Sequence, residues 1–280
     1  MSFKEMLLKK LDGKVDEAEA LLIPKGFQKT GEIIIVNLPI ELESKFSIIG
    51  EGFLEVFPNV RTVCAKVGEI IGEFRKPQIK VIAGEDNLEV ENFENGVWFC
   101  YDAEKIMFAK GNVSERGRLP KIVKEGEVIV DMFVGIGYFS LPIAKKVKGV
   151  KIYGIDLNPD SIFWLKKAIK KNKLGNLEVT LGDSKTEVEK LVAMGVKADR
   201  VLMGYLPPPE EFVPWALKIL KEGGVVHYDA LIRTDFVKED LAKVKELFEQ
   251  TGRKVRIVNP QRVKSYKPKV DHYVVDLQIN

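Results

Sequence analysis

The fold is decided by the stretch Val128-Ile-Val-Asp-Met-Phe-Val-Gly-Ile-Gly-Tyr-Phe-Ser140. It begins as a short apolar run after the turn signal Glu125-Gly126-Glu127, which predicts a buried parallel strand. Gly135 and Gly137 then let the backbone turn tightly and approach a ligand without a Cβ clash. Residues 138–147 follow as a predicted helix. Strand, glycine turn and helix together form the nucleotide-binding corner of a Rossmann-like α/β fold.

Asp131, at the end of this strand, narrows the class of ligand. A dinucleotide site has the pattern G-x-G-x-x-G and seats a pyrophosphate on the helix N-terminus, whereas here Ser140 takes the third glycine's place. A carboxylate repels a pyrophosphate and attracts an ammonium or a sulfonium. Asp131 therefore favours a cationic ligand, of which S-adenosylmethionine (SAM) is the common one. A tight turn without a ligand is the alternative that the glycine pair alone leaves open.

The next two predicted strands also end in acidic residues. Asp156 closes the second strand, 19 residues after Gly137, and that spacing suits a carboxylate that accepts both ribose hydroxyls. Residues 177–181 form the third strand, which is followed by Asp183 and Ser184. An acidic residue at this point can accept a hydrogen bond from an adenine amino group.

The rest of the chain continues the alternation of strands and helices. We predict strands at 198–203 and 223–228, a helix at 236–250, and an antiparallel closing pair at 255–258 and 272–278. The run Pro207-Pro208-Pro209 cannot lie within a central strand, so we expect a rigid loop there. That loop follows the fourth strand, at the edge where open α/β sheets bind ligands.

The chain before the glycine corner has a different texture. Residues 1–75 indicate a small α+β domain, residues 76–120 a strand-rich connector, and residues 121–280 the SAM-binding catalytic domain. Asn95-Gly96 predicts the tight turn of a hairpin. The polar segment 108–118 is expected to be a loop that either reaches over the ligand or is a solvated linker.

Composition bounds the class of protein. Hydrophobic content of 45% and charged content of 30% are ordinary for a globular protein, and no apolar run is long enough to cross a membrane. Cys64 and Cys100 lie outside any CxxC pattern and are expected to be reduced, packed thiols. His227 and His272 are too few and too separated to suggest a metal site. We expect a cytoplasmic monomer with neither a metal nor a membrane partner.

These residues resemble a known group. Similarity to class I SAM-dependent transferases is carried by Asp131-x-Phe-x-Gly-x-Gly-x-Phe-Ser140, Gly154-Ile-Asp-Leu-Asn-Pro159 and Gly182-Asp183. A narrower resemblance is to the archaeal and eukaryotic tRNA (guanine-N1) methyltransferases and the related wybutosine-synthesising aminocarboxypropyltransferases, which act on the purine next to the anticodon. It is carried by Glu94-Asn-Gly96, Asp102, Lys105, Phe108 and Glu115-Arg116.

Spacing and resemblance together give a predicted site. The predicted SAM contacts are Arg116, Asp131, Gly135, Gly137, Asp156, Leu157, Asp183 and Ser184. The predicted catalytic helpers are Glu115 and Tyr205.

Two departures separate the two relatives. The methyltransferases carry Phe-Ser-Pro-Arg-Leu, whose arginine assists catalysis, whereas this chain has Phe108-Ala-Lys-Gly-Asn112 with Gly111 at the arginine position. They also carry Asn-x-Pro after the fourth strand, whose asparagine positions the guanine, whereas this chain has Tyr205-Leu-Pro207. Both differences favour transfer of the 3-amino-3-carboxypropyl group of SAM to C7 of the tricyclic 4-demethylwyosine base of tRNA-Phe, releasing methylthioadenosine. Methylation of guanine N1 is the alternative.

We expect the partner to be tRNA, bound at its anticodon region, and basic residues to contact its phosphates. They form two clusters: Lys166, Lys167, Lys170, Lys171 and Lys173, and then Arg253, Lys254, Arg256, Arg262, Lys264, Lys267 and Lys269. Tyr266 could stack on a base. A solvated helix face and a charged loop are the plain alternatives. Two other functions stay open at this point: a small-molecule methyltransferase, and an RNA-binding module of SAM-binding fold without turnover.

Overall fold

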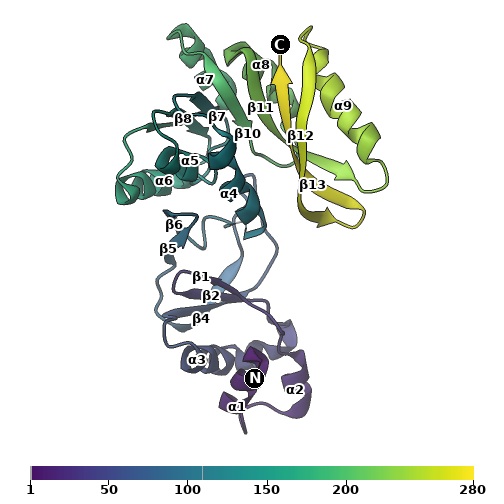
Figure 1. The fold of residues 1–280 in the computed structure, drawn as a ribbon. Coiled ribbons are helices and arrows are strands. Elements are labelled where there is room, and N and C mark those ends of the chain that lie inside the picture. The colour runs from purple at the N-terminus through teal and green to yellow at the C-terminus, as the bar shows by residue number, and fades with distance from the viewer. Residues whose placement is uncertain (1, 109) are drawn as a thin grey trace. The chain divides into compact units, whose positions relative to one another are not determined.

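The chain forms two compact units, which Figure 1 shows in a computed structural model that describes residues 2–108 and 110–280. One unit comprises Met1–Glu94 and Trp98–Phe108, and the other comprises Asn95–Val97 and Ala109–Asn280. Each has its own sheet and its own hydrophobic core. The expected fold class, a Rossmann-like α/β sheet with a smaller N-terminal α+β domain, is confirmed.

The N-terminal unit packs helices against a sheet of order β1-β2-β3-β4 within residues 2–108. Its elements are α1 (Phe3–Lys10), α2 (Glu17–Leu22), β1 (Gln28–Thr30), β2 (Ile33–Val36), the 3-10 turn η1 (Ile40–Lys45), α3 (Phe46–Val56), β3 (Thr62–Lys66) and β4 (Ile79–Gly84). Helix α3 buries Phe46, Ile49 and Phe53 in the core of this unit. Gly50 brings α3 close to β4, because a Cβ at this position would lie 2.7 Å from Cβ of Ala83.

Most of the predicted connector, residues 76–94 and 98–108, belongs to this unit, so the structure divides the chain elsewhere than at the expected boundary. Strand β4 pairs antiparallel with β3 and so extends the N-terminal sheet. Strands β5 (Glu89–Glu94) and β6 (Val97–Asp102) follow as a two-stranded sheet. Asn95 and Gly96 both have positive φ angles at the turn between them, as the predicted hairpin requires. Cys64 and Cys100 are both buried, as expected of packed side chains, and no disulfide joins them within the described residues.

The second unit is built on a seven-stranded sheet of order β12-β13-β11-β10-β7-β8-β9 within the described part of residues 95–280. Its strands are β7 (Val128–Asp131), β8 (Lys151–Asp156), β9 (Leu177–Leu181), β10 (Ala198–Met203), β11 (Leu220–Arg233), β12 (Val255–Lys267) and β13 (Val270–Ile279). The run from β9 to β11 is parallel, and β13 is antiparallel to both of its neighbours.

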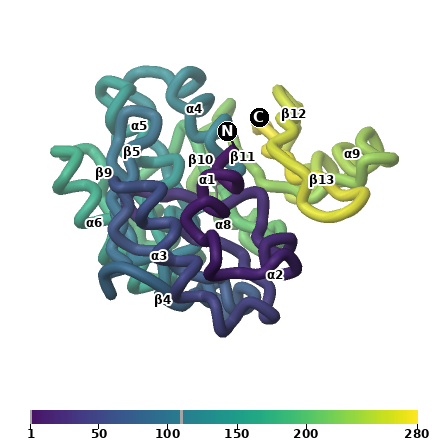
Figure 2. Tube along the Cα trace, turned by 90° about the horizontal axis from the view of Figure 1, so that it is seen from below, coloured from purple at the N-terminus to yellow at the C-terminus, as the bar shows by residue number. Residues whose placement is uncertain are grey.

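Helices connect these strands: α5 (Ser140–Lys146), α6 (Pro159–Asn172), α7 (Ser184–Ala193), α8 (Val213–Ile219) and α9 (Val237–Glu249), with the short η3 (Glu210–Phe212) before α8. Figure 2 shows α9 beside the β12–β13 hairpin. Among the helices of residues 2–108 and 110–280, none is long and apolar enough to cross a bilayer.

One sequence prediction in this unit was wrong, and one alternative that the sequence left open does not hold. The polar segment expected to be a loop folds instead as the short η2 (Lys110–Asn112) and the helix α4 (Val113–Ile122). It is helical because Arg116 and Leu119 lie on one buried face. The charged loop considered near residues 253–269 is mostly β12, whose hydrogen bonds to β13 order it.

Strand β11 continues beyond the carboxyl end of its neighbour β10. The last residue of β10, Met203, pairs with Tyr228, but β11 runs on to Arg233 and stays paired with β13 throughout. We call residues 229–233 of β11, with their partners in β13 and β12, the overhang. It extends past the edge at which the parallel strands end.

Candidate active site

The carboxyl ends of β7, β8 and β9 bring three predicted residues to one edge of the sheet. Asp131 is the last residue of β7, Asp156 is the last of β8, and Asp183 follows β9. The glycine corner lies between the first two, because the backbone N–H of Gly135 donates to Oδ2 of Asp156 over 2.7 Å. This edge is therefore acidic, and it adjoins a turn made of glycine.

Asp131 is the most deeply buried of these carboxyls. It is 1% exposed, and burial raises its pKa to about 7, although hydrogen bonds to the carboxylate oppose this rise. The hydroxyl of Ser140 donates to its Oδ2 over 2.6 Å, so the residue in the third-glycine position orients the carboxylate. A buried carboxyl beside the acids Asp156 and Asp229, whose charges raise its pKa further, gains by binding a cation.

Glycine is needed at positions 135 and 137 for reasons that differ in part. Gly135 and Gly137 both have positive φ, at +54° and +85°, which disfavours side chains with a Cβ. A Cβ at position 137 would lie 2.6 Å from Cγ of Leu141 and 2.7 Å from Cδ1 of Leu165. Gly137 thus lets α5 and α6 pack at the corner, a role additional to the tight turn and the ligand approach predicted from the sequence.

Asp156 is held firmly by the backbone. Its Oδ2 accepts from Gly135, and its Oδ1 accepts from the N–H of Asn158 over 2.9 Å. Burial raises the pKa of Asp156, and these two hydrogen bonds oppose the rise. Leu157, next in the chain, is exposed and offers an apolar surface beside the carboxylate.

Asp183 and Ser184 lie at the start of α7. Asp183 is its N-cap and accepts from the N–H of Thr186 over 3.1 Å. The hydroxyl of Ser184 donates to the carbonyl of Met132, which ties α7 to the end of β7. The structure therefore shows Ser184 as a link between elements.

Helix α4 carries two predicted residues, both fully buried. Glu115 and Arg116 are 1% and 0% exposed. The guanidinium carbon of Arg116 lies 5.9 Å from the ring centre of Tyr138, a residue of the glycine turn. Arg116 thus adjoins the corner, whereas Glu115 accepts three hydrogen bonds from Arg118, of 2.5 to 3.1 Å. In this arrangement Glu115 is ion-paired.

That ion pair begins a buried chain of charged groups that crosses the sheet. Its members, in order of contact, are Glu115, Arg118, Asp276, His227, Arg200 and Glu127. Arg118 bridges Glu115 on α4 to Asp276 on β13, and Arg200 on β10 reaches Glu127 over 2.7 Å. The chain fixes α4, and with it Arg116, against the sheet.

The protonation of this chain follows from its neighbours. Burial alone would raise the pKa of Asp276, but hydrogen bonds from His227 and Arg118 hold it well below its usual range. Burial lowers the pKa of His227 despite Asp276, so His227 is neutral. It donates from Nδ1 to Asp276 over 2.5 Å and accepts at Nε2 from Arg200 over 2.6 Å. Sequence reasoning missed these residues, because no local pattern links positions so far apart.

Tyr205 belongs to an aromatic cluster at the end of β10. Its ring stacks on Phe133 with centroids 5.2 Å apart and planes 27° apart, and Phe212 meets the same Phe133 edge-on at 4.9 Å. Tyr205 is 36% exposed, so part of the cluster is accessible to solvent. The proline loop predicted here is present, with a cis peptide between Leu206 and Pro207.

Comparison with known proteins decides the family. A family model described as the TRM5/TYW2 methyltransferase domain matches residues 90–258. A second model, described as the TYW2 N-terminal domain, matches residues 7–87. The chain belongs to the TRM5/TYW2 family.

Individual relatives of both kinds are similar to this chain. The tRNA(Phe) (4-demethylwyosine(37)-C(7)) aminocarboxypropyltransferase of Pyrococcus horikoshii is 35% identical, over 96% of this chain and 94% of that protein. The tRNA (guanine(37)-N(1))-methyltransferase Trm5b of Pyrococcus abyssi is 34% identical, over 92% of this chain and 76% of that protein. The crystal structure of P. horikoshii TYW2 in complex with MeSAdo superimposes with a TM-score of 0.84 at 31% identity, covering 99% of this chain and 98% of that one.

In this TRM5/TYW2 member, the two predicted basic clusters both lie on the surface. All five lysines of the first cluster are exposed on α6 or directly after it. In the second cluster, Arg262 pairs with Asp271 over 2.5 Å and Arg256 donates to Gln278 over 2.5 Å, while Lys267 and Lys269 are exposed. Ala109, within the segment aligned to the methyltransferase arginine block, lies outside the described residues.

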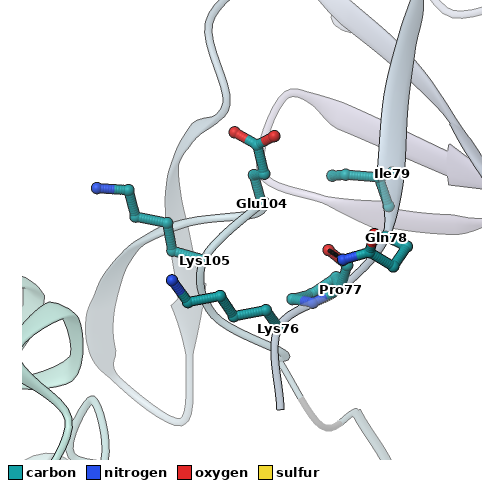
Figure 3. A pocket seen from close by; sticks show the side chains of 6 residues that line it. All are labelled: Lys76, Pro77, Gln78, Ile79, Glu104 and Lys105. Atoms are coloured by element: carbon teal, nitrogen blue, oxygen red, sulfur yellow. Dashed lines mark hydrogen bonds between the residues drawn. The ribbon is translucent and has the colours of Figure 1, made fainter. Parts of the chain in front are cut away.

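The N-terminal unit has a pocket of its own. Figure 3 shows it lined by Lys76, Pro77, Gln78, Ile79, Glu104 and Lys105. No predicted SAM or catalytic residue lines it. Because its lining has no carboxylate row and no glycine turn, it is not the site described above.

Proposed function

We propose that this protein transfers the 3-amino-3-carboxypropyl group of SAM to C7 of 4-demethylwyosine in tRNA(Phe), with methylthioadenosine as the by-product. The observation that carries the proposal is the match of residues 7–87 to the TYW2 N-terminal domain. The similarity to the P. horikoshii aminocarboxypropyltransferase over nearly all of both chains supports it. We further propose that the protein acts in the cytoplasm as a monomer, without a metal, on the anticodon region of the tRNA.

The residues at the carboxyl edge fit SAM as the donor. Asp156 has its carboxylate fixed beside the glycine turn, in the position for ribose hydroxyls. Asp183, the N-cap of α7, serves the adenine end together with the exposed Leu157. Asp131 provides a buried negative charge for the sulfonium end of the donor, and Arg116 lies beside the turn that holds it.

The transfer itself is a displacement at carbon. The sulfonium supplies a neutral thioether leaving group. C7 of the base attacks Cγ of the donor's amino-acid arm, the S–Cγ bond breaks with its electrons on sulfur, and the C7 proton is then lost to a base. The protein's part is to align C7, Cγ and sulfur and to keep the methyl group away from the base.

Two side chains are proposed to assist. The stack of Tyr205 on Phe133 provides a surface on which a planar tricyclic base can lie. Glu115 is our candidate acceptor for the C7 proton. It would act through a shift of its pairing with Arg118, because all its described hydrogen bonds come from that side chain.

Methylation of guanine N1 is the second candidate, because the P. abyssi Trm5b is 34% identical to this chain. Gly111 and Tyr205 stand where the resemblance places the arginine and asparagine of that reaction, and neither can replace them chemically. This difference favours aminocarboxypropyl transfer.

Product analysis tests the proposal. The protein is incubated with tRNA that carries 4-demethylwyosine, once with carboxyl-labelled and once with methyl-labelled SAM. We expect the carboxyl label in the tRNA and methylthioadenosine in solution. Transfer of the methyl label alone, with release of adenosylhomocysteine, would refute the proposal in favour of methylation.

A further inference from the structure

A fourth carboxylate extends the acidic row at the sheet edge. The parallel strands lie in the order β9, β8, β7, β10 and β11, and Asp183, Asp156 and Asp131 follow the first three. Asp229 follows in the same sense, one residue beyond the last pairing of β11 with β10. Its charge raises the pKa of Asp131, so the two carboxyls share one electrostatic environment.

Asp229 has a buried histidine as its partner. Nε2 of His272 on β13 lies 3.0 Å from Oδ2 of Asp229. Both residues are at least nine-tenths buried, at 4% and 1% exposure. Nδ1 of His272 is also buried, and it has no hydrogen-bond partner among the described residues. Such an unpaired buried nitrogen is costly unless a ligand satisfies it.

Both side chains lie on the face of the β11–β13 pair that also carries Asp276. Leu231 pairs with His272 and lies two residues from Asp229, so Asp229 and His272 share a face. Asp276 lies on that face too, four residues from His272, and it bonds Arg118 of α4. The pair therefore faces the helix that carries Arg116.

Lys264 adds a cation beside this pair. It pairs in register with His272, so its side chain emerges on the same face. Its aliphatic chain lies across η2: a Cβ added at Gly111 would be 2.5 Å from Cδ of Lys264 and 3.1 Å from its Nζ. The absence of a side chain at Gly111 thus leaves the space that the lysine occupies.

We propose that Asp229, His272 and Lys264 form the subsite for the charged end of the donor's amino-acid arm. This inference rests on the proposed function, because it assumes SAM as the donor. Asp229 accepts from the arm's ammonium, Lys264 pairs with its carboxylate, and Nδ1 of His272 supplies the remaining hydrogen bond.

The order of groups along the donor matches the order of strands. Adenine, ribose, sulfur and arm follow one another in SAM, as Asp183, Asp156, Asp131 and Asp229 do along the edge. Strands β7 and β11 are separated by β10 alone, so their axes are about 10 Å apart. The side chains of Asp131 and Asp229 shorten this gap. An arm anchored at its charged end has a fixed Cγ, which is the carbon that must meet the base.

Comparison of two ligands isolates the arm. Methylthioadenosine has the adenosine and the sulfur of SAM but lacks the arm. Affinities of both are measured by calorimetry for the wild type, Asp229→Asn, Lys264→Met and Gly111→Ala. The last variant keeps the lysine but displaces its ammonium, since its Cβ would overlap the lysine chain. Lys238→Met, an exposed lysine at the start of α9, is the matched control.

We expect SAM affinity to fall about tenfold or more in Asp229→Asn and Lys264→Met, and less in Gly111→Ala. Affinity for methylthioadenosine should change less than about twofold in each variant. Unchanged SAM affinity in Asp229→Asn and Lys264→Met would overturn the subsite. Equal losses of affinity for SAM and for methylthioadenosine in Gly111→Ala and Lys264→Met would overturn it too. Release of adenosylhomocysteine by the wild type would refute the proposed function instead, and the ratio of the two affinities would still decide the subsite.

Discussion

Binding of SAM should depend on pH through Asp131. Burial raises the pKa of this carboxyl to about 7 in the protein without a ligand, and only its ionised form attracts the sulfonium. The ionised fraction rises from about 3% at pH 5.5 to about 50% at pH 7.0, so apparent affinity should rise about 16-fold between them. Asp131→Asn removes the titrating group while its side-chain oxygen can still accept from Ser140.

The assay is calorimetric titration at pH 5.5, 6.0, 6.5 and 7.0 with SAM and with methylthioadenosine. Methylthioadenosine is neutral, so its curve reports any pH effect on binding of the adenosine part that both ligands share. We expect a steep curve for SAM alone, and its collapse in Asp131→Asn. A flat SAM curve in the wild type contradicts the reasoning. So does a slope that survives intact in Asp131→Asn, because it would belong to another carboxyl such as Asp229.

The same carboxyl should cost stability in the protein without a ligand. Its pKa is raised from an unfolded value near 3.8 to about 7, so its stabilising contribution is complete below about pH 3.8 and is lost as pH rises through 7. The loss above pH 7 amounts to about 3 pKa units, or up to about 4 kcal/mol. Asp131→Asn should therefore unfold at higher temperature than the wild type at pH 8, with the difference shrinking towards pH 4. Equal melting temperatures of Asp131→Asn and the wild type at pH 8 would show that the buried carboxylate of Asp131 does not destabilise the protein.

Three further substitutions test other parts of the site. Arg118→Met leaves Glu115 without its described partner and Asp276 with His227 alone, and should lower the free energy of unfolding by about 3 to 5 kcal/mol, measured by denaturant titration. A smaller loss than that of a surface Arg→Met control would contradict the bridging role. Gly137→Ala puts a Cβ 2.6 Å from Cγ of Leu141 at a φ of +85°, and should cost about 1 to 3 kcal/mol and weaken SAM binding. Tyr205→Phe should keep transfer activity and Tyr205→Ala should lose about tenfold, since the stack on Phe133 needs only a ring; equal losses in both would assign the role to the hydroxyl.

Short sequence patterns predicted those parts of the candidate site that are formed by residues close together in the sequence. The strand ending in Asp131, the glycine turn and the strand ending in Asp156 are each set by short-range rules about burial periodicity and backbone freedom. Parallel strand order then brings their ends to one edge without further information. The proline loop after β10 followed from the same kind of rule.

What could not be predicted depends on partners distant in sequence. Residues 108–118 were predicted to be a loop because they are rich in polar residues, but α4 buries Glu115 and Arg118 against Asp276, far along the chain. For His227, the sequence predicted only that it is not part of a metal site. Its position between Asp276 and Arg200 could not be predicted, because both partners are distant in sequence. Spacing also could not reveal that the hydroxyl of Ser184, a predicted SAM contact, donates to the carbonyl of Met132.

Strand β12 forms one margin of the seven-stranded sheet, and its outer backbone groups face away from β13. A margin thirteen residues long invites self-association. Pro260 and irregularities in its pairing interrupt it, and like charges such as Lys267 repel a second copy of the chain. We therefore expect the cations proposed to bind phosphates to oppose self-association of the chain as well. Substitutions that neutralise these cations to weaken RNA binding would also favour aggregation. Light scattering should therefore be measured together with each RNA-binding curve.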